Sequence, residues 1–230
     1  MIIKEFKGTG TTQLLILGGV HGNEITPIDT CMLLVDKIKD LSKSYYSRIV
    51  ILNCINPTGI INNTRDISNQ STNDLNRSLS VIDSEDIASK LASWIREMDV
   101  IIDIHSSPNC TEFLLINQDE NANSYVEFAN NIEVPYLLRY IANNTIKKYG
   151  LDLGKISFTL ELNAIDKIDL VSSLTGSEIV LDIIKNISLF EVKKEYPKYK
   201  PYLEWYYHKD GIFYPDNIIG ETTNIIRINC

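Results

Sequence analysis

The chain has 230 residues, of which 44% are hydrophobic and 23% are charged, and this composition excludes a fibrous repeat and an intrinsically disordered chain. The formal net charge is −8 and no run of lysine or arginine is present, which argues against a nucleic-acid partner. The first residues lack the apolar core of a signal peptide, and no apolar run approaches the length of a membrane span. We therefore expect a soluble, cytoplasmic protein without a membrane partner.

Short apolar runs alternate along the chain with stretches of helical periodicity, which is typical of an α/β layer fold. The apolar runs predict strands at 14–17, 49–52, 100–104, 113–116, 134–138 and 156–162. The helical stretches predict helices at 27–41, 84–98, 121–131 and 170–187. Thr26 is expected to be the N-cap of the first helix, ahead of Pro27. Because the strands are apolar on both faces, we expect a mixed, mostly parallel central sheet flanked by helices.

Two regions break this alternation. Residues 56–80 are rich in Asn, Thr, Ser and Gly without periodicity, which predicts a long functional loop. From about residue 195 the chain is dense in Tyr and Pro, and this pattern predicts short β-hairpins. We therefore expect a catalytic domain at residues 1–194 and a short β-rich C-terminal appendage at residues 195–230.

Two of the three histidines, His21 and His105, directly follow predicted central strands, and ligand sites gather at that edge of an α/β sheet. Glu24 follows His21 at i+3, which brings both side chains to one side of a helical turn. Two imidazoles and one carboxylate, with a fourth position for water, form a recognised catalytic zinc site. A hydrogen-bonded structural role is the alternative for either histidine alone. The pattern predicts one Zn²⁺ per chain at His21, Glu24 and His105, with Asp103 orienting a ligand.

Glu161 interrupts the otherwise apolar strand ISFTLEL. Buried acids are rare unless they are paired, so this placement needs a functional explanation. A zinc hydrolase needs a group that takes a proton from water and passes it to the leaving amine. Glu161 is therefore the predicted general acid and base, and an exposed glutamate on an edge strand is the alternative.

Four further polar residues are candidates for substrate contacts. Arg65, Asn76 and Arg77 lie in the long loop, where a guanidinium fork can bind a carboxylate and a cation can stabilise an oxyanion. Arg139 follows the predicted strand VPYLL and could face a second substrate carboxylate, with a solvated arginine as the alternative.

Taken in order, GGVHGNE, NDLNRS, DIHSS and the glutamate of TLELN resemble the succinylglutamate desuccinylase and aspartoacylase family, a branch of the zinc carboxypeptidase superfamily. The resemblance runs from about residue 14 to residue 163 and implies a zinc carboxypeptidase-like fold. By motif position it implies zinc ligands at His21, Glu24 and His105, and a general acid/base at Glu161. It also implies that Asn76 and Arg77 bind a substrate carboxylate. Arg65 resembles the arginine that polarises the scissile carbonyl, although its distance in sequence from NDLNRS is longer than expected.

The resemblance implies a zinc-dependent amidohydrolase, or deacylase, whose partner is a small-molecule N-acyl amino acid. Two alternatives use the same residues. One is a zinc carboxypeptidase that trims a C-terminal residue from a peptide, and the other is a non-catalytic, carboxylate-binding module of the same fold. The oligomeric state is open, with a homo-oligomer among the alternatives.

Overall fold

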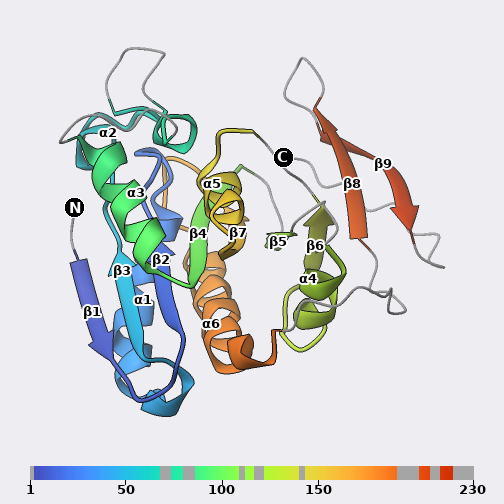
Figure 1. Ribbon diagram of the computed structural model, residues 1–230. Helices are drawn as coiled ribbons and strands as arrows, with labels where there is room; N and C mark the ends of the chain where they lie inside the picture. The colour runs from blue at the N-terminus through green and yellow to red at the C-terminus, as the bar shows by residue number, and fades with distance from the viewer. Residues whose placement is uncertain are drawn as a thin grey trace.

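The computed structural model describes residues 3–67, 74–79, 86–108, 112–116, 122–139, 143–190, 202–207 and 213–219. Within these residues, nine strands form one sheet in the order β1-β3-β2-β4-β7-β5-β6-β8-β9 (Figure 1). The strands are β1 (Ile3–Lys7), β2 (Gln13–Leu17), β3 (Arg48–Leu52), β4 (Val100–Ser107), β5 (Phe113–Ile116), β6 (Tyr136–Arg139), β7 (Ile156–Asn163), β8 (Tyr202–Tyr207) and β9 (Phe213–Ile219).

Most neighbouring strands in the sheet are parallel. Among the described strands, the antiparallel pairs are β1 with β3, β5 with β7, and β8 with β9. The prediction of a mixed, mostly parallel sheet is therefore confirmed. The two C-terminal strands form a hairpin that extends the sheet, because β8 pairs in parallel with β6. The division into domains at residue 194 stays a prediction.

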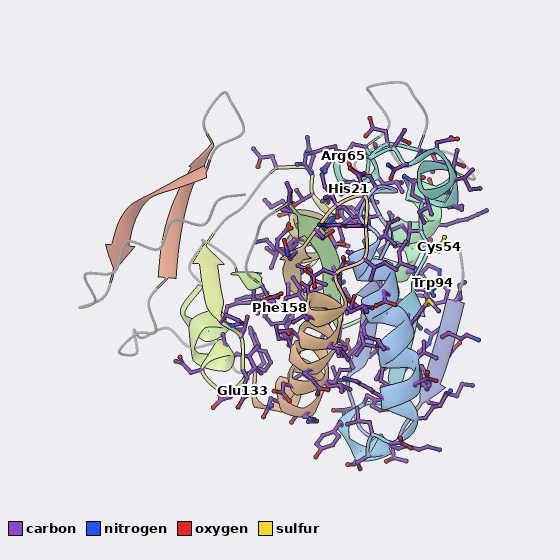
Figure 2. The ribbon with its side chains drawn as sticks, turned by 180° about the vertical axis from the view of Figure 1, so that it is seen from behind. His21, Cys54, Arg65, Trp94, Glu133 and Phe158 are labelled. Atoms are coloured by element: carbon purple, nitrogen blue, oxygen red, sulfur yellow. The ribbon has the colours of Figure 1, made fainter. Side chains whose placement is uncertain are left out.

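Helices cover both faces of this sheet. They are α1 (Thr26–Lys39), α2 (Pro57–Asn62), α3 (Ile87–Glu97), α4 (Ala122–Ala129), α5 (Ile146–Asp152) and α6 (Leu170–Asn186), with short 3₁₀ helices η1 (Lys43–Tyr45), η2 (Leu75–Arg77) and η3 (Ile187–Leu189). One buried cluster joins α1, α4 and α6 to one face, and a second joins α3 and α5 to the other. Figure 2, seen from behind, shows α1 and α6 in front of the sheet. None of the described helices has the length and apolar character needed to cross a membrane.

The continuous apolar run in β2 is explained by this layering. Leu14 and Ile16 pack into the cluster with α1, whereas Leu15 and Leu17 pack into the cluster with α3. All four side chains are fully buried. Each contributes roughly 2 kcal/mol of hydrophobic stabilisation. A strand buried on both faces must be apolar at every position, and this is why the sequence predicts β2 so clearly.

Among the described residues, one strand and two α-helices were not predicted from the sequence. β1 is an edge strand whose side chains are mostly exposed, so it lacks the apolar run that marks a central strand. α2 lies inside the predicted loop at 56–80, where the Asn56 side chain caps the helix by accepting from Gly59 N–H at 2.8 Å. α5 has only seven residues, capped by Thr145, which is too short for periodicity to reveal.

The predicted role of Thr26 as an N-cap is wrong. Ile25 is the N-cap of α1 and makes no side-chain cap hydrogen bond. The Thr26 hydroxyl instead accepts from Asp169 N–H at 3.1 Å and is 3.3 Å from the Lys167 carbonyl oxygen, to which it donates. Thr26 therefore ties the start of α1 to the segment that leads into α6, a long-range contact that local sequence does not reveal.

Three neighbouring parallel strands, β2, β4 and β7, end at the same edge of the sheet. The predicted metal ligands and the predicted acid/base come from the ends of these strands and from the turn after β2. The parallel arrangement is what brings residues that are far apart in sequence to one place.

Candidate metal centre and active site

The turn after β2 carries His21 and Glu24. Gly19 opens the turn with φ = +66°, a left-handed conformation that favours glycine. The backbone of Gly22 crosses that of Gly59 so closely that an added Cβ would lie 2.0 Å from Gly59 C. Glu24 N–H then donates to the His21 carbonyl at 3.3 Å, which closes a helical turn. Both side chains consequently point to the same side, as the i+3 spacing predicts.

His105, at the end of β4, completes a buried group with these two residues. His21 Nδ1 is 2.6 Å from Glu24 Oε1, and His105 Nδ1 is 3.0 Å from Glu24 Oε2. The two Nδ1 atoms are 3.1 Å apart, and the ligand atoms that the three residues can offer all lie within 4.8 Å of one another. The residues expose 4% of their surface or less. Three side chains from two distant parts of the sequence thus form one group that could bind a metal.

The outer nitrogen of each histidine contacts a carboxylate. His21 Nε2 is 3.1 Å from Asp74 Oδ1, and His105 Nε2 is 2.8 Å from Asp103 Oδ2. A carboxylate can only accept, so each Nε2 that faces an aspartate donates a proton to it. With a cation at the centre in place of a proton, each Nδ1 would present its lone pair to that cation. This carboxylate–histidine arrangement is how proteins orient metal-ligating imidazoles.

The electrostatics of the group favour a positive charge at its centre. Burial on its own would raise the pKa of Glu24, but the charges and hydrogen bonds of His21 and His105 outweigh it and hold that pKa well below its usual range. Burial would lower the pKa of His105, whereas Asp103 and Glu24 raise it well above the ordinary value. The same surplus of negative charge that attracts a proton also attracts a metal cation.

The donor set fits a zinc ion. Two imidazole nitrogens and one carboxylate are a known catalytic zinc set, and neighbouring donor atoms around tetrahedral zinc stand about 3.3 Å apart. The described contacts between the three residues are 2.6 to 3.1 Å long, so a small outward shift would accommodate the ion. Without a cation or a proton between them, the two Nδ1 lone pairs would repel each other.

Glu161 lies beside this group. It is the in-register neighbour of His105 across the parallel pair β4 and β7, and Ser107 Oγ donates to Glu161 Oε2 at 3.1 Å. Burial raises the pKa of Glu161 to about 7, against the opposing effects of the His105 charge and the Ser107 hydrogen bond. Because β7 lies between β4 and β5, the alternative of an edge-strand glutamate is wrong. A carboxyl group that titrates near neutrality can both accept and donate a proton.

Arg65 reaches the same group from the segment that follows α2. Its Nη1 is 3.5 Å from Glu24 Oε1, and its Nε donates to Asp74 Oδ2 at 3.2 Å. Figure 2 labels both Arg65 and His21 at this end of the molecule. The Arg65 side chain remains 47% exposed, so its guanidinium group stands at the rim of the buried group. This is a suitable place for a cation that contacts substrate.

Asn76 and Arg77 lie in η2 and behave differently. Asn76 is buried, its Oδ1 accepts from Ile146 N–H at 2.8 Å, and its Nδ2 lies 3.3 Å from His105 Nε2. Because that ring nitrogen donates to Asp103, it cannot also accept from Asn76. Arg77 is exposed and donates to the Asn76 carbonyl oxygen at 2.7 Å. Both residues border the group, and their role in substrate binding stays a prediction.

Residues 10–187 match the model of the succinylglutamate desuccinylase/aspartoacylase catalytic domain. The chain belongs to this family. A search of curated protein sequences gave no match.

Solved structures of proteins named for the desuccinylase/aspartoacylase family, and of an ectoine utilization protein, share this fold. The succinylglutamate desuccinylase/aspartoacylase of Rhodobacter sphaeroides superposes with a TM-score of 0.68 at 19% identity, over 88% of this chain and 65% of that one. The product-bound ectoine utilization protein EutE (DoeB) of Ruegeria pomeroyi gives 0.67 at 16% identity, over 90% and 66%. The succinylglutamate desuccinylase of Chromobacterium violaceum gives 0.64 at 17% identity, over 89% and 70%. The chain thus spans about two thirds of the length of the first two proteins.

Two residues of this candidate site were missed by the sequence analysis. Asp74 accepts from His21 and Arg65 through its side chain and from Asn76 N–H at 2.8 Å, and the hydrogen bonds of His21 keep its pKa low despite burial. Ser107 holds Glu161. Asp74 stands inside the NDLNRS segment and Ser107 inside DIHSS, so proximity to the motifs was the available signal.

The structure describes the main chain of Arg139 but not its side chain. Arg139 is the last residue of β6. Its contact with a second carboxylate stays a prediction.

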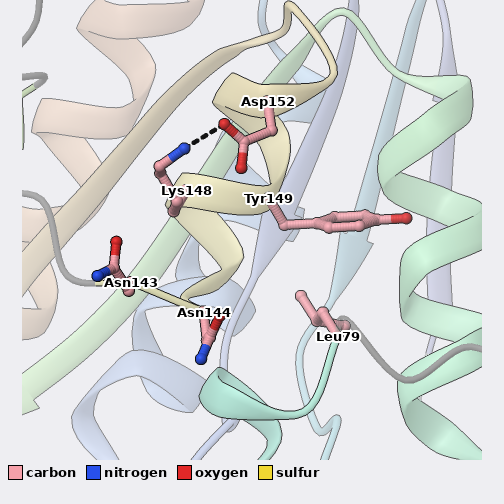
Figure 3. Close-up of a pocket in the computed structure, with 6 residues that line it drawn as sticks. All are labelled: Leu79, Asn143, Asn144, Lys148, Tyr149 and Asp152. Atoms are coloured by element: carbon pink, nitrogen blue, oxygen red, sulfur yellow. Dashed lines mark hydrogen bonds and ion pairs between the residues drawn. The ribbon is translucent and has the colours of Figure 1, made fainter.

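A separate pocket of about 190 Å³ lies beside α5 (Figure 3). It is lined by Leu79, Asn143, Asn144, Lys148, Tyr149 and Asp152. Lys148 and Asp152 form an ion pair across one turn of α5. The pocket contains none of the predicted site residues, so we do not assign the chemistry to it.

Proposed function

We propose that this protein is a zinc-dependent amidohydrolase that cleaves the amide bond of an N-acylated amino acid. The observation that carries the proposal is the juxtaposition of a buried His₂Glu group with Glu161, the in-register strand neighbour of His105. Membership of the desuccinylase/aspartoacylase catalytic-domain family supports a deacylase-type reaction.

His21, Glu24 and His105 would hold one zinc ion per chain through both Nδ1 atoms and a carboxylate oxygen. Zinc bound there would supply a Lewis acid and lower the pKa of a water molecule toward neutrality. Asp74 and Asp103, which contact the two Nε2 atoms, would keep the imidazoles in the tautomer and orientation that this requires.

Glu161 would move the proton of the reaction. Ser107 holds the carboxylate through Oε2, and Oε1, which has no contact with Ser107, would take a proton from the water that attacks the amide carbonyl. Burial raises the pKa of Glu161, which favours uptake of the proton and its return to the leaving nitrogen. The products are a carboxylic acid and a free amino acid.

The cationic and amide groups at the rim would position the substrate. Arg65, close to Glu24, would stabilise negative charge that develops on the scissile carbonyl oxygen. Asn76 and Arg77 would bind the α-carboxylate, and the anchoring of Asn76 Oδ1 by Ile146 orients its NH₂ group. Arg139 would bind a second carboxylate where the substrate has one.

The test is a panel of N-acetyl- and N-succinyl-amino acids, run beside short peptides with free C-termini and accompanied by elemental analysis of the purified protein. We expect one zinc per chain and faster hydrolysis of the acyl-amino acids. Faster trimming of the peptides would replace the proposal with a carboxypeptidase. Metal-loaded protein that binds acyl-amino acids without hydrolysing them would identify a binding module instead.

A further inference from the structure

The main chain of Arg65 is held more firmly than its side chain. Its carbonyl oxygen accepts from Gly22 N–H at 3.3 Å and from Asn56 Nδ2 at 3.2 Å. The side chain is 47% exposed and depends on contacts at 3.2 and 3.5 Å with two carboxylates. A long guanidinium side chain loses about 2 kcal/mol of rotamer entropy when it is fixed, so its position depends on where its main chain is held. The two donors to the Arg65 carbonyl hold that main chain in place.

Asn56 is the side-chain donor, and it joins three segments of main chain. It is fully buried, its Oδ1 accepts from Gly59 N–H at 2.8 Å, and its own N–H donates to the Gly19 carbonyl at 2.9 Å. Asn56 thereby links the glycine turn after β2, the first turn of α2 and the Arg65 carbonyl. These contacts of Asn56 are all with main-chain atoms, so the residue acts on backbone position.

The main-chain and side-chain atoms around Asn56 are closely packed. An added Cβ on Gly59 would lie 2.4 Å from Asn56 Nδ2, and one on Gly22 would lie 2.0 Å from Gly59 C. Atoms this close transmit a displacement to one another, because protein interiors are close-packed. A shift of the Asn56 amide therefore moves Arg65 relative to the turn that carries Glu24.

The identity of the residue is also specific. Asn, Asp and Ser are comparably good helix caps, so capping α2 does not by itself require asparagine. Asparagine meets the two partners with two separate atoms, because Oδ1 accepts from Gly59 N–H and Nδ2 donates to the Arg65 carbonyl. Aspartate has no donor, and serine has a single oxygen, on a shorter side chain, for both contacts.

We infer that Asn56 is a positioning residue that sets the place of the Arg65 guanidinium group at the rim of the site. The inference rests on the proposed function for its effect on turnover. Its effect on the Arg65 side chain is independent of any substrate.

The test compares Asn56→Asp and Asn56→Ser with the parent protein. Both variants keep a cap for Gly59; Asn56→Asp lacks a donor to Arg65, and Asn56→Ser has only one short-reaching oxygen for both contacts. We expect the Arg65 Nε–H signal in the ¹H–¹⁵N spectrum, assigned by its loss in Arg65→Lys, to shift or broaden in both. Zinc content should stay at the parental level, and kcat should fall about tenfold to a hundredfold with KM little changed. In an Arg65→Ala background, the same substitutions should lower kcat less than about twofold.

Asp86→Ala is the matched control, because Asp86 caps α3 by accepting from Ser89 N–H at 2.8 Å on an element that carries no site residue. This variant should lose a helix cap without changing the Arg65 signal or kcat. An unchanged Arg65 signal in both Asn56 variants, or equal losses of kcat with and without Arg65, would overturn the inference. If no form of the protein hydrolyses an acyl-amino acid, the proposed function fails, and the Arg65 signal alone still decides the role of Asn56.

Discussion

Replacing Glu161 with glutamine should stop turnover and, in the metal-free protein, stabilise the fold above about pH 5. Burial raises the pKa of Glu161 from 4.5 to about 7 in the folded protein. The unfolded chain therefore releases this proton first, and stability falls as pH rises from 4.5 to 7 and stays lower above it. The gap between the two pKa values corresponds to at most about 3 kcal/mol, and contact of the side chain with solvent reduces it. Glutamine carries no charge at any pH, so the variant does not lose this stability as the pH rises.

The assay is urea unfolding of the metal-free parent and Glu161→Gln at pH 4 and at pH 8, with Glu133→Gln as an exposed control. We expect the parent and Glu161→Gln to match at pH 4, and Glu161→Gln to be more stable by about 2 kcal/mol at pH 8. With zinc bound, the cation favours the charged carboxylate, so the gain at pH 8 should shrink. Turnover should drop at least a hundredfold while zinc content stays unchanged. A stability difference that is the same at both pH values, or full activity in the variant, would refute the assigned environment and role of Glu161.

Three further perturbations test neighbouring contacts. Ser107→Ala removes a hydrogen bond that lowers the pKa of Glu161, so the acid limb of the pH–rate profile should move to higher pH, whereas an unmoved limb would contradict the contact. Asp74→Asn removes the charge that orients His21 and contacts Arg65, and zinc affinity measured by competition with a chelator should fall about tenfold to a hundredfold. Gly22→Ala places a Cβ 2.0 Å from Gly59 C, and thermal unfolding should show a loss of several kcal/mol; a stable variant would mean that the two segments can separate.

The sequence predicted the central strands and the meeting of the histidines for a clear physical reason. Strands buried on both faces require continuous apolar runs, which β2 and the first half of β4 have, whereas in β7 apolar residues alternate with polar ones. Once those strands are parallel neighbours, His21 and His105 must lie at one edge of the sheet. The family motif then indicated Glu161 as their neighbour.

The parts that escaped prediction depend on contacts between distant segments. Arg65 reaches Glu24 because Gly22 and Asn56 hold its carbonyl oxygen, and no local period encodes such a bond. Asp74 is 53 residues from the histidine that it orients. Thr26 resembles a cap in sequence, but its hydroxyl bonds to the segment before α6.

The continuous pairing of β4 with β7 determines which insertions and deletions the active site can tolerate. Eight successive residues of each strand face one another, from Val100 with Ile156 to Ser107 with Asn163. The ladder, and not the intervening 48 positions, determines which acid stands beside which imidazole. Insertions or deletions in residues 108–155 can therefore alter the rim while the separation between proton carrier and metal ligand is preserved. A slip of one residue within the ladder would instead send Glu161 to the opposite face of the sheet and abolish the reaction outright.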